Sequence, residues 1–312
     1  MMQRYRFLFV FALFSVAGPA GLKAQEPETF ILKDFQLRGP VKLCVVKANY
    51  GEERFEFDRE GRLLKSLTRY DEADYDITYY RYRDGELVER RDEVYRDRQF
   101  DEQTSIAHFY TRDSLAPQLV ERIVSYDREL QEQIAYHYNA EGRLTKWIRT
   151  RDEGVDETRV EYSRYKNEST ATYRANGETL RSVRISASPG TGGMETELVK
   201  EYAAGVPRTA LETTRDASGR TVRETEFEWD ATKETFRPVL RREFTYDPAG
   251  FTSRIVETPL SDEAGAPEIR TREYIYQMDG KEPGNWIRQV ITPENSIAVR
   301  QILYFEAEPG SE

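Results

Sequence analysis

The sequence predicts an all-β protein in which antiparallel β-hairpin repeats form a long, curved or rolled meander sheet. Two observations predict this class: a phrase of two aromatic residues one apart, a turn and a glycine recurs along the chain, and helical periodicity is almost absent. Residues 115–135 come closest to a helical pattern, yet Val120, Val124 and the flanking hairpin phrases favour strands there too. The pattern leaves open whether the sheet closes.

Each repeat is expected to be one hairpin. In FEFDREGRL, residues 55–63, Phe55 and Phe57 lie on one face of a strand because successive side chains point to opposite faces. An oxygen-bearing side chain then opens the turn by accepting backbone hydrogen bonds, as expected for Asp58, Asn139, Asp216 and Asp247. A glycine follows and supplies the positive φ that the reversal needs, at Gly61, Gly85, Gly142, Gly177, Gly219, Gly250 and Gly280.

One interval between these glycines is irregular. The 57 residues from Gly85 to Gly142 correspond to about two ordinary periods, with a degenerate unit such as SYDREL at 125–130 inside. The tripeptide WIR follows a unit's glycine at 147–149 and again at 286–288, which supports true repetition.

The expected organisation is a signal peptide over residues 1–24, an N-terminal linker over 25–36, one repeat domain over 37–305 and a disordered tail over 306–312. Arg4 and Arg6 precede an apolar run that Gly18 and Pro19 interrupt, which is typical of a cleaved leader rather than a retained anchor. We therefore expect export, to the periplasm, the cell surface or the medium, with no integral membrane segment after cleavage. The glycine-rich stretch at 187–195 predicts either a break between two lobes or a long hairpin loop.

Charge and cysteine content exclude several classes. The formal net charge is −10, and removal of a leader carrying Arg4, Arg6 and Lys23 would make it more negative, which argues against a nucleic-acid partner. Cys44 is the only cysteine, so no intramolecular disulfide can form, and its apolar neighbours indicate a strand residue rather than a reactive thiol.

Through the phrase Y-x-Y-D-x-x-G-R-L, the chain resembles the YD-repeat (Rhs-like) proteins from about Tyr50 to Phe305. The resemblance implies a curved β-repeat sheet. Large members of that family wind their repeats into a shell around a toxin, whereas this chain has far fewer units and no toxin-sized segment. The tetrapeptide DPAG at 247–250 echoes the motif that ends an Rhs core, but we interpret it as a turn. The segments DFQLRGPVKLCVV and GNWIRQV also resemble the ends of short secreted repeat proteins of Bacteroidetes type, which supports export.

Catalytic and cofactor motifs are missing from the sequence. His108 and His137 are the only histidines, and both are expected to have surface or cross-strand roles. No spacing selects an acid pair from the 56 acidic residues, so we predict a protein that is not an enzyme and has no cofactor. The run Asp71, Glu72, Asp74 and Asp76 is a weak calcium candidate, with a solvated acidic loop as the alternative.

The leading functional hypothesis is an exported β-repeat protein that binds or scaffolds an envelope or extracellular partner, protein or glycan, on a broad face or rim. Exposed tyrosines and tryptophans could stack on sugar rings, although strand spacing places most of them in packing roles. Two alternatives remain: a carboxylate-dependent enzyme acting on envelope polysaccharide, and an outer-membrane β-barrel. The barrel ranks last because charged residues alternate with the rings on nearly every strand.

Overall fold

The structure is a computed structural model that describes residues 27–113, 116–188, 193–260 and 268–306. The expected signal peptide lies outside the described residues, as does nearly all of the expected tail. No helix within the described ranges is long and apolar enough to cross a membrane.

One short 3-10 helix, η1 (Leu32–Phe35), is followed by strands throughout the described chain. The strands are β1 (Val41–Ala48), β2 (Gly51–Phe57), β3 (Leu63–Arg69), β4 (Tyr75–Arg83), β5 (Glu86–Arg96), β6 (Gln99–Phe100), β7 (Ile106–Asp113), β8 (Gln118–Ser125), β9 (Leu130–Tyr138), β10 (Leu144–Arg151), β11 (Gly154–Tyr165), β12 (Glu168–Ala175), β13 (Glu178–Ser188), β14 (Met194–Ala203), β15 (Val206–Arg215), β16 (Thr221–Asp230), β17 (Thr235–Tyr246), β18 (Thr252–Pro259), β19 (Arg270–Met278), β20 (Trp286–Thr292) and β21 (Ser296–Tyr304). The all-β, antiparallel prediction is confirmed, and residues 115–135 fall in β8 and β9 rather than in a helix.

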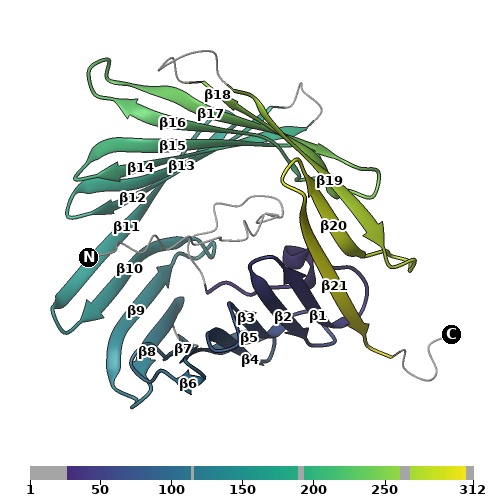
Figure 1. Ribbon diagram of the computed structural model, residues 1–312. Coiled ribbons are helices and arrows are strands. Elements are labelled where there is room, and N and C mark those ends of the chain that lie inside the picture. Colours follow the sequence, from purple (N-terminus) through teal and green to yellow (C-terminus); the bar gives the residue numbers. More distant parts are fainter. Residues whose placement is uncertain (1–26, 114–115, 189–192, 261–267, 307–312) are drawn as a thin grey trace, which may run out of the picture.

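The sheet closes into a barrel, which corrects the prediction of a rolled or open meander. Each strand pairs with the next in antiparallel fashion, except that β5 pairs with both β6 and β7. The last strand returns to the first, with Val46 of β1 opposite Arg300 of β21. The ring therefore has 20 strands, and β6 is an appendage to it (Figure 1). Hairpin repeats predict each local pairing, but the accumulated curvature that joins the two ends is a property of the whole sheet.

The two faces of this ring are distinct. Phe35 of the N-terminal segment packs on Phe55 and Phe57, with ring centroids 4.5 Å and 5.3 Å apart. Because η1 lies inside the ring beside β1 to β3 (Figure 1), the face that carries Phe55 and Phe57 is the inner wall. Register then assigns every other strand residue, since paired residues share a face. The alternate positions form the outer wall.

The inner wall carries most of the buried side chains. One cluster, under the N-terminal segment, contains Leu37, Val41, Cys44, Val46, Phe57 and Leu63. A second cluster lies along β7 to β13 and contains Tyr110, Leu119, Ile134, Tyr136, Tyr138, Leu144, Val160, Ala171, Tyr173, Val183 and Ile185. The predicted aromatic face is thus the concave one.

The turns have the chemistry that their residues suggest. The Asp58 carboxylate accepts a hydrogen bond from the Arg62 backbone at 2.8 Å, and Gly61 has a φ of +80°. The same arrangement recurs at three further turns, formed by Asn139 with Gly142, Asp216 with Gly219, and Asp247 with Gly250. Gly85, Gly177 and Gly280 also have positive φ. At the glycine-rich stretch, β13 and β14 pair directly on either side, so the sheet is continuous there.

Candidate functional site

The regular hairpin pattern fails between Gly85 and Gly142, in the interval whose length was irregular in the sequence. Beyond Asp92, β5 leaves its partner β7 and pairs instead with β6, with Tyr95 opposite Phe100. The Ser105 hydroxyl accepts a hydrogen bond from the Val94 backbone at 3.0 Å, which occupies the edge of β5 that β7 no longer covers. The split in the ladder opens the outer wall at this place.

Two adjoining hollows lie on the outer wall along β4, β5, β7 and β8. The smaller is about 330 Å³ and contacts Leu64, Tyr79 and Arg81. The larger is about 640 Å³ and extends to Phe109 and Tyr126. Arg91 and Glu93 line both hollows, so we treat the pair as one site and call it the outer groove.

Aromatic rings form the sides of the outer groove and remain open to solvent. Tyr79 is 36% exposed, Phe109 37% and Tyr126 56%. Tyr126 is held edge-on against Phe100 at 4.8 Å, and Phe100 in turn contacts Tyr95 at 5.5 Å. The small side chain of Ala107 also lines the larger hollow. Strand spacing predicted packing roles for most of the tyrosines and tryptophans, and Tyr79 and Tyr126 are exceptions.

Charged groups of both signs line the outer groove. Glu89 is only 7% exposed and forms ion pairs with Arg81 at 3.0 Å and with Arg91 at 2.8 Å. The Tyr95 hydroxyl donates to Glu93 at 3.1 Å, and burial together with that hydrogen bond raises the pKa of Tyr95 to about 12. Tyr95 is therefore a neutral hydrogen-bond donor at physiological pH. The outer groove thus combines fixed polar groups with open aromatic faces.

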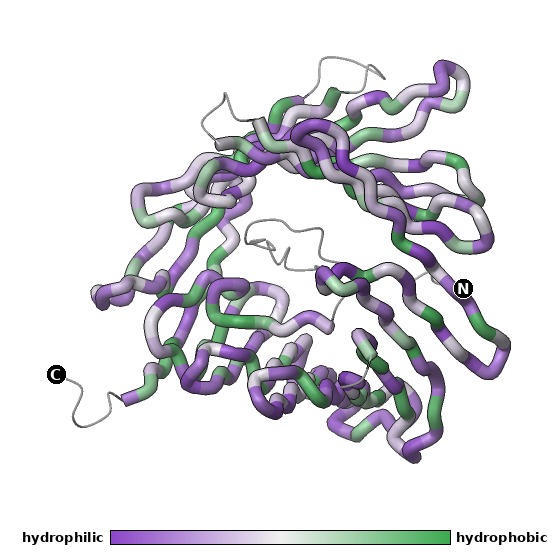
Figure 2. Tube along the Cα trace, turned by 180° about the vertical axis from the view of Figure 1, so that it is seen from behind, coloured by the Kyte–Doolittle hydropathy of each residue, from purple (hydrophilic) through white to green (hydrophobic). Residues whose placement is uncertain are grey.

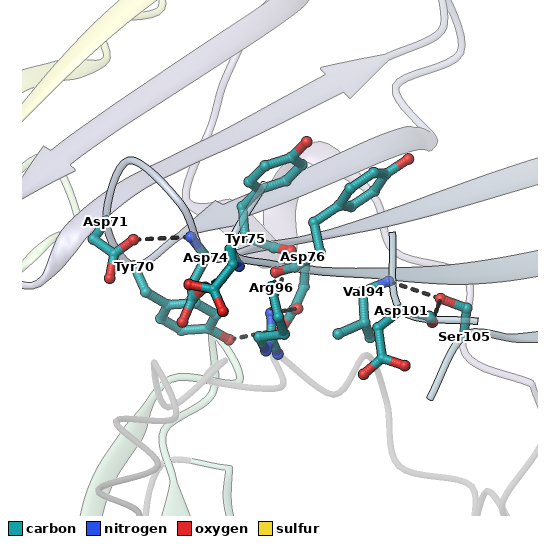
Figure 3. Close-up of polar contacts among 11 residues, drawn as sticks. Tyr70, Asp71, Asp74, Tyr75, Asp76, Val94, Arg96, Asp101 and Ser105 are labelled. Carbon is teal, nitrogen blue, oxygen red and sulfur yellow. Dashed lines mark hydrogen bonds and ion pairs between the residues drawn. The ribbon is translucent and has the colours of Figure 1, made fainter. Parts of the chain in front are cut away.

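The acidic turn predicted as a weak calcium candidate lies beside this region (Figure 3). Asp71 accepts hydrogen bonds from the backbones of Ala73 and Asp74, at 2.7 Å and 2.8 Å, which lower the pKa of Asp71. Asp76 binds Arg96 at 2.8 Å and accepts the Tyr70 hydroxyl at 3.0 Å.

The other two carboxylates of the turn have partners of their own. Asp74 accepts the Asp97 backbone N–H at 3.0 Å, and Glu72 contacts Arg98 at 3.3 Å. The four carboxylates therefore serve separate partners. Nowhere in the described ranges do three or more His, Cys, Asp or Glu side chains form a group able to hold a metal ion.

Behind the outer groove, the same strands carry a buried polar cluster on the inner wall. His108 contacts Glu121 through Nδ1 at 2.7 Å and Arg90 through Nε2 at 2.9 Å. A guanidinium only donates, so Nε2 accepts and Nδ1 carries the proton that is donated to Glu121. Tyr136 donates to the other Glu121 oxygen at 2.8 Å, and Arg90 also binds Asp92.

Of the two roles expected for His108, the surface one is wrong, because His108 is 6% exposed. The cross-strand one is confirmed by its contacts with Arg90 and Glu121, although the cluster as a whole was not predicted. Alternation within β7 places His108 on the same face as Tyr110, but only the pairing of β5, β7, β8 and β9 brings its partners together. His137 lies opposite Lys146 on the outer wall, away from the neighbouring Tyr136 and Tyr138 rings, as expected.

Comparison with known proteins was made for sequence and for structure. No protein family and no curated protein matches the sequence. A porin-like protein from Bacteroides uniformis ATCC 8492 is 9% identical, with 85% of this chain and 98% of that chain covered and a TM-score of 0.34. A porin-like protein from Bacteroides vulgatus ATCC 8482 is 10% identical, with 86% and 99% covered and a TM-score of 0.27.

The assignment to YD-repeat (Rhs-like) proteins is wrong. Within the described residues the strands close into a 20-stranded barrel instead of the curved repeat sheet that the resemblance implied. The phrase that carried the resemblance is the local signature of any long-stranded hairpin with an acid-opened turn and a bulge glycine. Such a phrase specifies one hairpin and does not select among the folds built from hairpins. The sequence left open whether the sheet closes, and the structure shows that it does.

Proposed function

We propose that this is an exported β-barrel protein that works in water and binds an acidic glycan in the outer groove. The observation that carries the proposal is the set of open aromatic faces, Tyr79, Phe109 and Tyr126, around fixed charged groups. The C–H face of a sugar ring packs on an aromatic face, while its hydroxyl groups need donors and acceptors close by. Sites for small ligands commonly join apolar walls to a few placed polar groups in this way.

A glycan suits the outer groove better than an extended peptide does. Extended peptides commonly bind by adding a strand to a free sheet edge. The closed ring pairs β1 with β21, and at the split beside the outer groove β6 and Ser105 occupy the β5 edge. A ligand in the outer groove would therefore contact side chains instead of a free strand edge. Those side chains are aromatic rings and charged groups that can hydrogen-bond to hydroxyls.

The charges in the outer groove favour a ligand that carries carboxylate or other acidic groups. Four arginines line it, Arg81, Arg91, Arg122 and Arg128, against three acids, Glu89, Glu93 and Asp92, the last of which is paired with Arg90. Arg122 and Arg128 are exposed. In a chain whose formal net charge is −10, this local excess of positive charge supports attraction of an anionic sugar chain.

Binding rather than hydrolysis is favoured by the placement of the acids. Glu89 and Glu93 are four residues apart on one strand, so their Cα atoms are separated by about 13 Å. Paired glycosidase carboxylates are roughly 5 to 9.5 Å apart, and one of them must be able to donate a proton. Glu89 is instead engaged by two guanidinium groups, those of Arg81 and Arg91.

The outer wall favours water over lipid. On β2 the outward residues are Glu52, Arg54 and Glu56, and on β11 they include Glu157 and Arg159. Each basic residue near the middle of a membrane would cost about 2–4 kcal/mol on a lipid-facing strand. Figure 2 shows hydrophilic residues on strands all around the ring, without a continuous hydrophobic band.

The second candidate function is an outer-membrane barrel, for which one stretch of the outer wall provides support. Ile275, Ile297, Val299 and Leu303 are exposed on β19 and β21 and form an apolar strip next to the closing seam. This strip covers only part of the circumference, whereas a membrane barrel needs an apolar band around all of it. The apolar strip is therefore partial support for an outer-membrane location.

Glycan binding is tested by titration with charged and neutral oligosaccharides, for example oligogalacturonates and malto-oligosaccharides, followed by calorimetry. We expect Tyr79→Ala and Phe109→Ala each to weaken binding of the acidic series about threefold to tenfold, because each removes one stacking face. Tyr165→Ala is the matched control, since Tyr165 is exposed on the distant end of β11 and lines neither hollow. Equal loss in all three variants, or no binding of any acidic oligosaccharide, refutes the proposal.

The choice between water and membrane is tested by fractionation of cells that express the tagged chain. We expect release by osmotic shock or carbonate wash without detergent. Retention in the membrane until detergent is added would favour the outer-membrane candidate and contradict the proposed environment.

A further inference from the structure

The most unusual buried group in the molecule is Arg300, on the inner wall of β21. It is only 7% exposed, and its guanidinium lies 3.5 Å from the centre of the Trp286 ring. One nitrogen, Nη2, donates to the Phe35 carbonyl of the N-terminal segment at 2.9 Å. Nε and Nη1 are buried without an acceptor, and so is Nε1 of Trp286. Three donor nitrogens, two of Arg300 and one of the Trp286 ring beside it, therefore have no hydrogen-bond acceptor.

Arg300 also lacks a direct ion-pair partner among the described residues, and Glu53 acts on it only through a longer-range electrostatic interaction. Within the described residues no carboxylate lies at ion-pair distance from its guanidinium, in contrast to Arg242, which contacts three glutamates. Burial lowers the pKa of Arg300 to about 10, yet the group remains cationic at neutral pH. The neighbouring Cys44 supplies no negative charge, because burial raises the pKa of its thiol to about 11.

Glu53 is the nearest acid that could balance Arg300. Val46 separates the two in the ladder, since Val46 is opposite Glu53 on one side and opposite Arg300 on the other. Burial raises the pKa of Glu53, while the hydrogen bond with Tyr50 and the charge of Arg300 act in the opposite direction. Buried cations are ordinarily paired, and buried N–H groups ordinarily have acceptors.

We propose that the Arg300 and Trp286 side chains form a site for a small inorganic anion of the chloride class on the inner wall. The anion would accept from the unsatisfied N–H groups and balance the guanidinium, while the Trp286 ring face stabilises the cation from the other side. The Phe35 carbonyl and the N-terminal segment cover the site, so bound anion would also hold that segment against β21. The site is separate from the outer groove.

The test compares chloride with gluconate, an anion too large for a buried site, at constant ionic strength. We expect chloride to raise the thermal midpoint of the wild type and to broaden the ³⁵Cl NMR line. Arg300→Gln should abolish both effects, and Trp286→Phe, which keeps a ring but loses Nε1–H, should weaken apparent chloride affinity several-fold. Arg288→Gln on the outer wall of β20 and Trp229→Phe are the matched controls and should leave both responses unchanged.

Two results would overturn the proposal. The first is a wild type that responds equally to chloride and gluconate, or a chloride response that survives in Arg300→Gln. The second is a wild type without a chloride response, together with a loss of stability in Glu53→Gln, because the counter-charge would then come from the chain itself. The ³⁵Cl measurement on wild-type protein decides the matter even where Arg300→Gln fails to fold.

Discussion

At the scale of single residues, burial changes the roles that the sequence suggests for charged and aromatic side chains. Glu121 and Glu161 are both strand carboxylates, yet Glu121 is buried with three polar partners and Glu161 is exposed beside Arg174. Local sequence does not distinguish them, because each directly follows a valine within a strand. How much each carboxylate contributes to the stability of the fold depends on its contacts with other strands.

Glu121→Gln should therefore make the free energy of unfolding less dependent on pH in the acid range. Burial tends to raise the pKa of Glu121, but hydrogen bonds from His108 and Tyr136 outweigh it and lower the pKa below the usual 4.5. Because the folded pKa is lowered, the contribution of Glu121 is complete above pH 4.5 and is lost as pH falls through the folded value. We expect the substitution to cost about 2 kcal/mol at pH 7 and to flatten the pH dependence of unfolding below 4.5.

Glu161→Gln provides the comparison for that measurement. Its partner Arg174 is 3.2 Å away and both side chains are solvent-exposed, so urea unfolding should shift by less than about 1 kcal/mol. Two results would contradict the role assigned to the buried polar cluster around Glu121. One is an equal loss of unfolding free energy in both variants, and the other is a wild-type pH dependence of unfolding at acid pH in Glu121→Gln.

At the scale of elements, the hairpin is the unit that the sequence specifies, and two of its turns differ in what surrounds them. Gly61 and Gly142 both have positive φ, +80° and +74°. A Cβ at Gly61 would lie 3.0 Å from Leu32 Cδ1, whereas a Cβ at Gly142 meets nothing within 4 Å. The Gly61 carbonyl also accepts the Leu32 N–H at 2.9 Å, so this turn anchors the N-terminal segment.

Gly142→Ala should cost about 1–2 kcal/mol, from backbone strain alone. Gly61→Ala should cost more, because the new methyl group also displaces Leu32. Hydrogen exchange of residues 30–37 separates the two effects: we expect faster exchange there in Gly61→Ala and wild-type exchange in Gly142→Ala. Unchanged exchange in both variants would mean that the turn does not anchor the segment.

At the scale of the whole molecule, closure depends on one seam. Asn285 is fully buried beside it, where its side chain donates to the Arg38 carbonyl and the Tyr304 hydroxyl, both at 2.8 Å, and accepts the Arg38 N–H at 2.8 Å. The chain before β1, the start of β20 and the end of β21 are thus joined by one amide. Asp279 also binds Tyr304 at this place.

Asn285→Ala should destabilise the ring and open it at the seam. Removing the amide leaves several buried partners unsatisfied, which we expect to cost roughly 3 kcal/mol. Hydrogen exchange should accelerate in β1 and β21 before it does in β11 to β14. Asn139→Ala at an exposed turn is the control, with a smaller and local effect, and uniform acceleration across all strands in Asn285→Ala would argue against a seam.

The sequence by itself determined the strands and the turns. Aromatic alternation, the turn-opening acids and the glycines act within about ten residues, so the all-β class and positions such as Asp58, Gly61, Asn139 and Gly142 could be derived from local chemistry. The irregular interval between Gly85 and Gly142 was also visible, and it contains the residues that line the larger hollow of the outer groove.

Only the tertiary structure decided closure, the identity of the two walls and the partners of buried charges. The pairing of β1 with β21 joins residues about 250 positions apart and follows from curvature summed over the whole ring. The exposure of Tyr79, Phe109 and Tyr126, and the isolation of Arg300, likewise depend on which strands become neighbours. A hairpin phrase does not determine which distant strands become neighbours, because the interactions it specifies lie within its own two strands and turn.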